Sequence, residues 1–199
     1  MSNFRWGILG TGGIARAFAL DLALLGDHVV AAVGSRTVDS ATAFAADFPG
    51  SLPYGSYEEL VTADVDAIYV ASPHPMHEEH AMLAMRAGKP VLCEKAFTIN
   101  HGQAQALIDY SEEKKIPLME AMWSRFLPHF IAIKELVSAG AIGEVINISA
   151  DHGQYLPPER ALRLWEPELG GGALLDLGIY PLTLAHLILG QPASIVATA

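Results

Sequence analysis

The chain has 199 residues, 51% of them hydrophobic, and a formal net charge of −10 at neutral pH. This hydrophobic content supports a packed core and argues against intrinsic disorder, while the acidic balance argues against a nucleic-acid or anionic-membrane partner. The single cysteine, Cys93, cannot form an intrachain disulfide, which is typical of a reducing compartment. The N-terminus lacks a signal-peptide pattern, and no apolar run approaches the roughly 18 residues of a membrane span. The sequence therefore predicts a soluble cytoplasmic protein.

Short apolar runs alternate with helical patterns over the first 121 residues. Strands that alternate with helices of about ten residues or more indicate βαβ units and a parallel sheet. The runs are rich in Val, Ile and Ala without polar alternation, as expected when helices cover both faces of the sheet. Gly26, Gly88 and Pro117 mark expected helix ends. The expected strands are residues 4–10, 28–35, 65–72, 90–95 and 117–121.

The pattern changes near Trp123, and a second domain is expected to span residues 122–199, after a first domain of residues 1–121. Residues 128–143 and 173–190 are expected to form helices, and residues 144–155 and 193–199 to form strands. A last strand with no evident partner indicates either a truncated chain or a sheet edge completed by another subunit.

A glycine-rich turn of the form G-x-G-x-x-A follows the first expected strand and opens a helix, the context in which this fingerprint indicates dinucleotide binding. The first glycine permits the tight turn, the second lets the backbone approach a pyrophosphate, and the alanine allows close helix packing. The helix N-terminus then offers N–H groups and a positive dipole to the anion. The alternative is a turn that binds no ligand. The predicted cradle is Gly10, Thr11, Gly12, Gly13, Ile14 and Ala15.

The end of the second expected strand distinguishes NADP from NAD. An NAD site usually has an acidic residue there to bind the ribose 2′-hydroxyl, whereas this chain has Ser35 and Arg36. A guanidinium can pair with a 2′-phosphate and stack on adenine. NADP is therefore the predicted cofactor and NAD is less favoured, although Arg36 could also be an ordinary surface residue.

Together these features resemble the Gfo/Idh/MocA family of NAD(P)-dependent oxidoreductases. Residues 72–97, SPHPMHEEHAMLAMRAGKPVLCEKAF, resemble its stretch from the nicotinamide pocket to a Glu-Lys-Pro motif. Residues 120–128, EAMWSRFLP, and 170–180, GGGALLDLGIY, resemble the branch of dihydrodiol and D-xylose dehydrogenases. The resemblance implies an α/β protein: a Rossmann domain, then the start of an α+β domain whose open, mostly antiparallel sheet often forms a homodimer.

The resemblance also implies the catalytic residues. Lys95 matches the family's active-site lysine, and its ammonium would stabilise a developing alkoxide and lower the pKa of a nearby phenol. Tyr180 would then be the base, with Asp176 supporting it from one helical face four residues away. Without the resemblance, the favoured interpretations are a cap or salt-bridge residue for Asp176 and a half-buried core aromatic for Tyr180. Ala96 replaces the motif's proline, which removes a fixed φ angle directly after Lys95.

Three histidines spaced by three residues, His74, His77 and His80, raise the possibility of a metal site, but no further ligand stands at a convincing spacing, and none is predicted. His80 is expected on a helix surface and Cys93 in a buried strand. Trp165 could cover the substrate cleft or pack between domains. Beyond the cradle, Ser35 and Arg36, the resemblance implies cofactor contacts from Ser72, His74, His77, Glu94, Lys95, Trp123 and Arg125.

The sequence thus predicts an NADP-dependent oxidoreductase that transfers a hydride between a CH–OH group of a sugar, polyol or cyclic diol and nicotinamide. One alternative is a family enzyme that keeps its NADP bound between half-reactions. A second is a truncated or non-catalytic NADP-binding protein, such as a redox sensor or scaffold.

Overall fold

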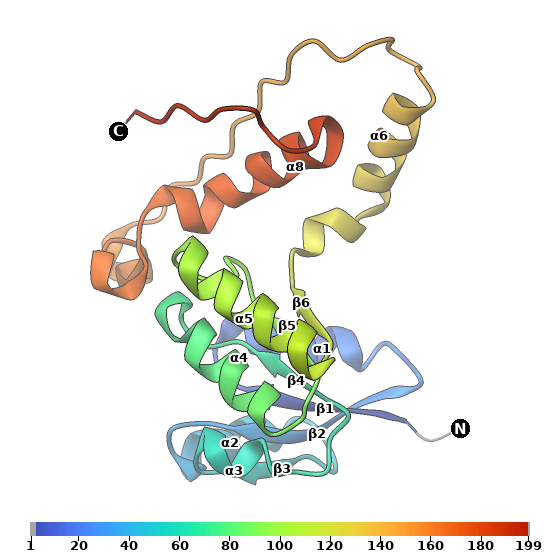
Figure 1. Ribbon diagram of the computed structural model, residues 1–199. Helices are drawn as coiled ribbons and strands as arrows, with labels where there is room; N and C mark the ends of the chain where they lie inside the picture. The colour runs from blue at the N-terminus through green and yellow to red at the C-terminus, as the bar shows by residue number, and fades with distance from the viewer. Residues whose placement is uncertain (1–2, 199) are drawn as a thin grey trace. The chain divides into compact units, whose positions relative to one another are not determined.

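The computed structural model describes residues 3–198, except the side chains of residues 160 and 161 (Figure 1). The chain separates into two compact units, Met1–Ala121 and Met122–Ala199. The first unit is a parallel sheet covered by helices, and the second is largely helical within the described residues.

A six-stranded parallel sheet, in the order β3-β2-β1-β4-β5-β6, forms the first unit. This order places a topological switch point between β1 and β4, where doubly wound sheets bind their ligands. All five expected strands are confirmed, and only β3 was missed, because three residues including Pro53 give no periodic signal; an edge strand tolerates such a proline. The strands are β1 Phe4–Leu9, β2 His28–Gly34, β3 Leu52–Tyr54, β4 Ala67–Val70, β5 Val91–Cys93 and β6 Leu118–Glu120.

Most helices of this unit begin at a residue whose side chain accepts a hydrogen bond from a backbone N–H of the first turn. Thr37 caps α2, Ser56 caps α3 and Asn100 caps α5, as polar N-cap residues commonly do. The helix α1 instead begins after Gly12, which has no side chain to do so. The helices are α1 Gly13–Leu22, α2 Val38–Ala45, α3 Tyr57–Leu60, α4 His77–Arg86 and α5 His101–Lys114, with a short 3-10 turn, η1, at His74–Met76.

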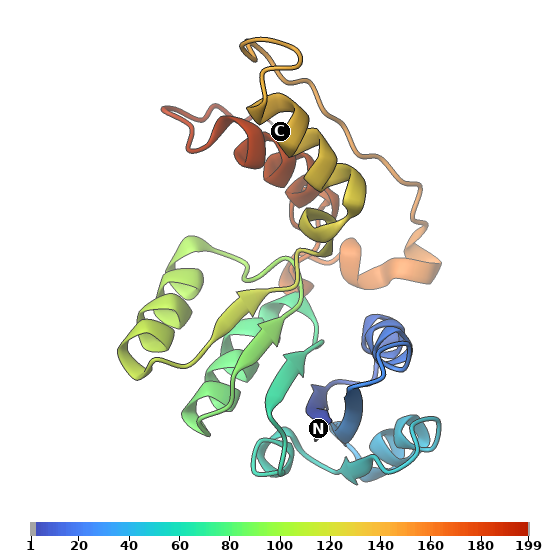
Figure 2. The ribbon, with the colours of Figure 1, turned by 90° about the vertical axis from the view of Figure 1, so that its right-hand side faces the viewer.

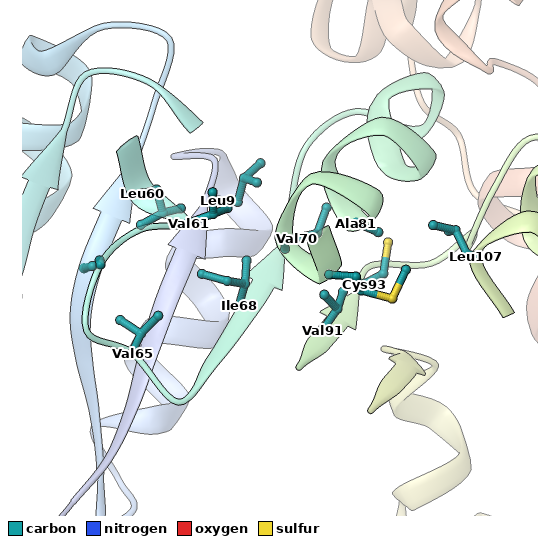
Figure 3. Packing of buried hydrophobic residues seen from close by; sticks show 14 residues of the cluster. Leu9, Leu60, Val61, Val65, Ile68, Val70, Ala81, Val91, Cys93 and Leu107 are labelled. Atoms are coloured by element: carbon teal, nitrogen blue, oxygen red, sulfur yellow. The ribbon is translucent and has the colours of Figure 1, made fainter. Parts of the chain in front are cut away.

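Successive strand residues face two separate cores, one on each side of the sheet. In β1, Ile8 faces the core with α1 and α2, whereas Leu9 faces the core with α3, α4 and α5. In β4, Tyr69 faces the first of these cores, whereas Ile68 and Val70 face the second. Helices on both faces explain why the strand sequences lack polar alternation. Figure 2 shows α1 on the opposite face from α4 and α5, and Figure 3 shows the second core, with Leu60, Ala81, Val91, Cys93 and Leu107.

The second unit contains two longer helices, α6 Pro128–Ser138 and α8 Ile179–Leu189, which contact each other. The expected helices at 128–143 and 173–190 are thus confirmed, with one change: the second begins as a π-helical turn, η5. The shorter elements are η2 Trp123–Phe126, α7 Pro158–Ala161, η3 Leu162–Leu164, η4 Pro167–Leu169 and η5 Leu174–Gly178.

The two strands expected in this unit do not form within residues 144–155 and 193–198; residue 199 lies outside the described residues. A strand exists only when its backbone pairs with a neighbour, and the described part of this unit supplies no such neighbour. Ile146, Ile195 and Val196 are more than four-fifths exposed here. The apolar runs are therefore irregular segments rather than strands.

One helical stretch, Pro167–Leu189, is long and apolar enough to cross a membrane by length and composition alone. No such run is expected from the sequence, because charged residues such as Asp176 interrupt the apolar pattern. The mean hydropathy of the helical stretch is nevertheless high. Asp176 in this stretch is buried and paired with Arg163, but only 6% of the apolar window is buried within the described residues.

Candidate cofactor and active site

The glycine-rich turn leaves β1 at the switch point of the sheet. Gly10 has a φ of +107°, and a Cβ added there would lie 2.9 Å from the carbonyl oxygen of Ala71. Because of both features, any residue with a Cβ would be strained at this position. Its N–H donates to the carbonyl of Gly34 at 3.0 Å, which ties the turn to the end of β2.

The first turn of α1 is open to solvent. Gly12 is the N-cap, with extended backbone and no side-chain cap, and a Cβ added to Gly12 or Gly13 would meet no atom within 4 Å. Ala15 is fully buried, as close helix packing requires, while Ile14 is 47% exposed. Backbone N–H groups at such a helix end can bind a phosphate. The predicted cradle therefore fits a dinucleotide pyrophosphate.

The end of β2 carries a buried hydroxyl and an exposed cation. The Oγ of Ser35 lies 3.4 Å from Oγ1 of Thr11, so the two expected cofactor residues meet across the turn. Arg36 is exposed. Burial raises the pKa of Tyr57, and the positive charge of Arg36 opposes that rise, which places Arg36 in the electrostatic range of α3. A positive side chain in this position suits a 2′-phosphate.

The histidines after β4 are buried, where they contact neighbouring backbone or side-chain groups. His77 is fully buried, with Nδ1 2.9 Å from the carbonyl oxygen of Ala96 and Nε2 2.7 Å from that of Ser72. His74 is also buried and packs edge-to-face on His77. The expectation for His80 was wrong: it is 8% exposed, because Nδ1 pairs with Oγ of Ser72 at 2.8 Å and its ring packs on Tyr57.

Lys95 follows β5 at the carboxyl edge of the sheet and is half-buried. Its backbone N–H donates to Oε2 of Glu94 at 3.1 Å, and the hydroxyl of Tyr69 donates to Oε1 of the same carboxylate. Glu94 is 7% exposed, and burial raises its pKa. Because both oxygens accept hydrogen bonds from the protein, the geometry favours a positioning role for Glu94 over the expected direct cofactor contact. The Lys95–Ala96 peptide bond is cis.

In the second unit, Tyr180 lies among two other rings. The indole N–H of Trp123 donates to the hydroxyl oxygen of Tyr180 at 3.1 Å, and the two rings meet edge-to-face. The ring of His152 lies 5.0 Å from that of Tyr180, and the side-chain amide nitrogen of Gln154 lies 3.3 Å from Nε2 of His152. This cluster surrounds a phenol with groups that can donate or accept hydrogen bonds.

Asp176 is buried in the π-helical turn, with its carboxylate 3.5 Å from a guanidinium nitrogen of Arg163. The expectation that Asp176 and Tyr180 share a helical face assumed α-helical spacing. A π turn closes over five residues rather than four, so a spacing of four does not by itself place both side chains on one face. Arg125 is exposed on η2. Trp165 is 59% exposed and donates to the carbonyl of Leu156.

Several residues of these clusters were missed from the sequence. Tyr69 looks like an ordinary strand aromatic, and Glu120 only ends β6, yet Oε1 of Glu120 accepts the backbone N–H of Phe97 at 3.0 Å. His152 and Arg163 lie outside every motif. No sequence signal identifies these partners, because each depends on contacts between distant segments. Among residues 3–198, no three His, Cys, Asp or Glu side chains gather as a metal-ligand set.

Comparison with known proteins gives the family. Residues 4–122 match the "Oxidoreductase family, NAD-binding Rossmann fold", and residues 130–199 match the "GFO/IDH/MocA C-terminal domain". The chain is 44% identical to a D-xylose 1-dehydrogenase (NADP(+)) of Hypocrea jecorina, over 91% of this chain and 52% of that protein. It is 40% identical to a trans-1,2-dihydrobenzene-1,2-diol dehydrogenase of Xenopus laevis, over 97% of this chain and 59% of that one.

A solved 3-ketoreductase of Actinomadura kijaniata, in complex with NADP and TDP-benzene, is 33% identical and superimposes with a TM-score of 0.80 over 95% of this chain and 58% of that chain. That enzyme has also been solved with a lysine replaced by alanine and with a tyrosine replaced by phenylalanine. The chain spans a little over half the length of the curated relatives it matches. Its sequence and fold place it in the Gfo/Idh/MocA family of oxidoreductases.

Proposed function

We propose that this protein is an NADP-dependent oxidoreductase that transfers a hydride between a CH–OH group and nicotinamide. The observation that carries the proposal lies within the first unit. An uncapped glycine cradle and Lys95 stand at the carboxyl ends of β1 and β5, which flank β4 in one parallel sheet. A phosphate-binding turn and an active-site cation at the same sheet edge suit a dinucleotide enzyme.

NADP is the proposed cofactor, and when bound it would accept or supply the hydride. Gly10 to Ala15 would hold its pyrophosphate, and Ser35 with Arg36 its 2′-phosphate. The relative from Hypocrea jecorina is named for NADP(+), and the solved 3-ketoreductase carries NADP. No acidic residue occupies positions 34–37 to repel a 2′-phosphate. Further contacts from Ser72, His74, His77, Trp123 and Arg125 remain part of this proposal.

Tyr180 is the proposed base that takes the hydroxyl proton during oxidation and returns it during reduction. Trp123 supports this role, because an N–H donated to the phenolic oxygen stabilises negative charge on that atom. Lys95 would stabilise the oxygen of the substrate as its charge develops. Asp176, held by Arg163, would bind or orient the substrate. A lysine and a tyrosine are also the residue types replaced in the solved 3-ketoreductase.

A sugar, polyol or cyclic diol is the proposed substrate class. Support comes from the names of the curated relatives, a D-xylose dehydrogenase and dihydrodiol dehydrogenases. His152 and Gln154 add polar atoms beside Tyr180, which suits a substrate with several hydroxyl groups. A cytoplasmic location and a homodimer complete the proposal. The lone, buried Cys93 suits a reducing compartment, and exposed apolar residues such as Ile131 and Leu136 on α6 could pack in a dimer.

The test is NADPH formation, followed by absorbance, with NADP+ and a panel that includes D-xylose and a trans-dihydrodiol. NAD+ is assayed in parallel. Turnover that prefers NADP+ supports the proposal and identifies the substrate class. Tight binding of NADPH without turnover of any substrate would instead favour a non-catalytic NADP-binding protein. Cofactor that survives gel filtration would favour an enzyme that retains NADP between half-reactions.

A further inference from the structure

The segment that carries Lys95 is held at each of four consecutive residues. The N–H of Glu94 donates to the carbonyl of Val70 at 2.9 Å, and the N–H of Lys95 to the Glu94 carboxylate at 3.1 Å. His77 lies 2.9 Å from the carbonyl of Ala96, and Glu120 accepts from the N–H of Phe97 at 3.0 Å. Residues of β4, α4 and β6 thus fix the backbone on both sides of Lys95.

Tyr69 also contributes to this segment, but it contacts the side chain of Glu94 rather than the backbone. Its ring is 1% exposed and stacks on Phe18 of α1, with centroids 3.9 Å apart and planes 25° from parallel. A ring confined between β4 and α1 can aim its hydroxyl in few directions. That hydroxyl donates to Oε1 of Glu94, which leaves Oε2 for the N–H of Lys95.

We propose that Tyr69 is a positioning residue for Lys95, acting through the Glu94 carboxylate. The tyrosine hydroxyl fixes the orientation of the carboxylate, and the carboxylate fixes the backbone from which the Lys95 side chain departs. This matters especially here, because Ala96 lacks the ring that fixes φ in proline. The inference rests on the proposed catalytic role of Lys95.

Removal of the Tyr69 hydroxyl leaves a buried carboxylate oxygen without this donor, so the carboxylate can rotate or bind a proton. The backbone N–H of Lys95 then loses a fixed acceptor. A displacement of about 1 Å at a catalytic group can cost roughly 100-fold in rate. The hydrogen bonds from Tyr69 and from the Lys95 N–H to Glu94 include no residue of the phosphate cradle, so cofactor affinity should change little.

The experiment compares Tyr69→Phe with Tyr110→Phe, which removes a phenol hydroxyl from the half-buried Tyr110 on α5. Turnover number, KM, NADP+ dissociation constant by calorimetry and melting temperature are measured for each. Tyr69→Phe should lower kcat roughly 10- to 100-fold and leave the NADP+ dissociation constant within about threefold of the native value. Tyr110→Phe should leave all these quantities near native. If kcat falls in Tyr69→Phe while the NADP+ affinity falls by a similar factor and the melting temperature also drops, the role of Tyr69 is merely structural and the inference is overturned.

A second pair of variants tests the route through Glu94. In a Glu94→Ala background, Tyr69→Phe should lower kcat less than about twofold further, because residues that act as one unit have non-additive effects. A full additional loss would overturn that route. If Glu94→Ala fails to fold, the single substitution and its control still decide the role of Tyr69. Lys95→Ala separates the two claims: native turnover in Lys95→Ala contradicts the proposed function, whereas an inactive Lys95→Ala beside a fully active Tyr69→Phe contradicts only this inference.

Discussion

Replacing Gly12 with alanine should separate cofactor binding from folding. The backbone of Gly12, with φ −76° and ψ 178°, suits alanine, and the new Cβ would meet no protein atom within 4 Å. The fold should therefore tolerate the change, at a cost of no more than about 1 kcal/mol for a poorer N-cap. The same Cβ would stand where the backbone is expected to approach the pyrophosphate.

Loss of one hydrogen bond to a charged phosphate costs about 1.5–3 kcal/mol. This cost corresponds to a roughly 10- to 100-fold higher dissociation constant for NADP+. Calorimetric titration with NADP+ measures this change, and thermal unfolding measures stability. Gly10→Ala is the contrasting control. Its positive φ and its 2.9 Å approach to Ala71 should lower the melting temperature even without cofactor. Native NADP+ affinity in Gly12→Ala would refute the cradle.

Four further predictions concern separate residues. Arg36→Ala should weaken NADP+ binding roughly 10- to 100-fold and leave NAD+ binding nearly unchanged, as calorimetry with both cofactors would show. His152→Phe should raise KM for D-xylose roughly 2- to 10-fold through a lost hydrogen bond, and raise KM for an aromatic dihydrodiol less. The thiol of Cys93 is fully buried and its pKa is raised by burial, so a chromogenic thiol reagent should react only as the protein unfolds. Burial also raises the pKa of Glu94, so the native state binds its proton more tightly than the unfolded state does. The contribution of Glu94 to stability should therefore fall as pH rises from about 4.3 through the native pKa, and urea unfolding of Glu94→Gln should show a flatter pH dependence in that range.

The elements that follow from local pattern were predictable. Buried parallel strands leave unmistakable apolar runs, so β1, β2, β4, β5 and β6 could be identified from the sequence. The conformation of the glycine-rich turn was predictable because the positive φ of Gly10 and the uncapped helix end at Gly12 are local features, whereas its binding of a pyrophosphate stays a prediction.

The elements that depend on distant contacts were not predictable. His80 has the sequence context of a surface helix residue, but Ser72 and Tyr57 bury it. The expected strand at 144–155 has suitable residues but lacks a paired neighbour within the described residues. The π turn at Leu174–Gly178 was not predictable either, because nothing in the spacing of Asp176 and Tyr180 indicates it.

The central claim is hydride transfer from a substrate carbon to NADP+. The most direct measurement uses D-xylose deuterated at C1, or the corresponding label in another substrate that gives turnover, and analyses the reduced cofactor by mass spectrometry. The proposed function predicts one deuterium at C4 of nicotinamide in each NADPH formed by the native protein, and little or no labelled NADPH from Tyr180→Phe or Lys95→Ala. Unlabelled NADPH, or native labelling in both variants, would contradict it.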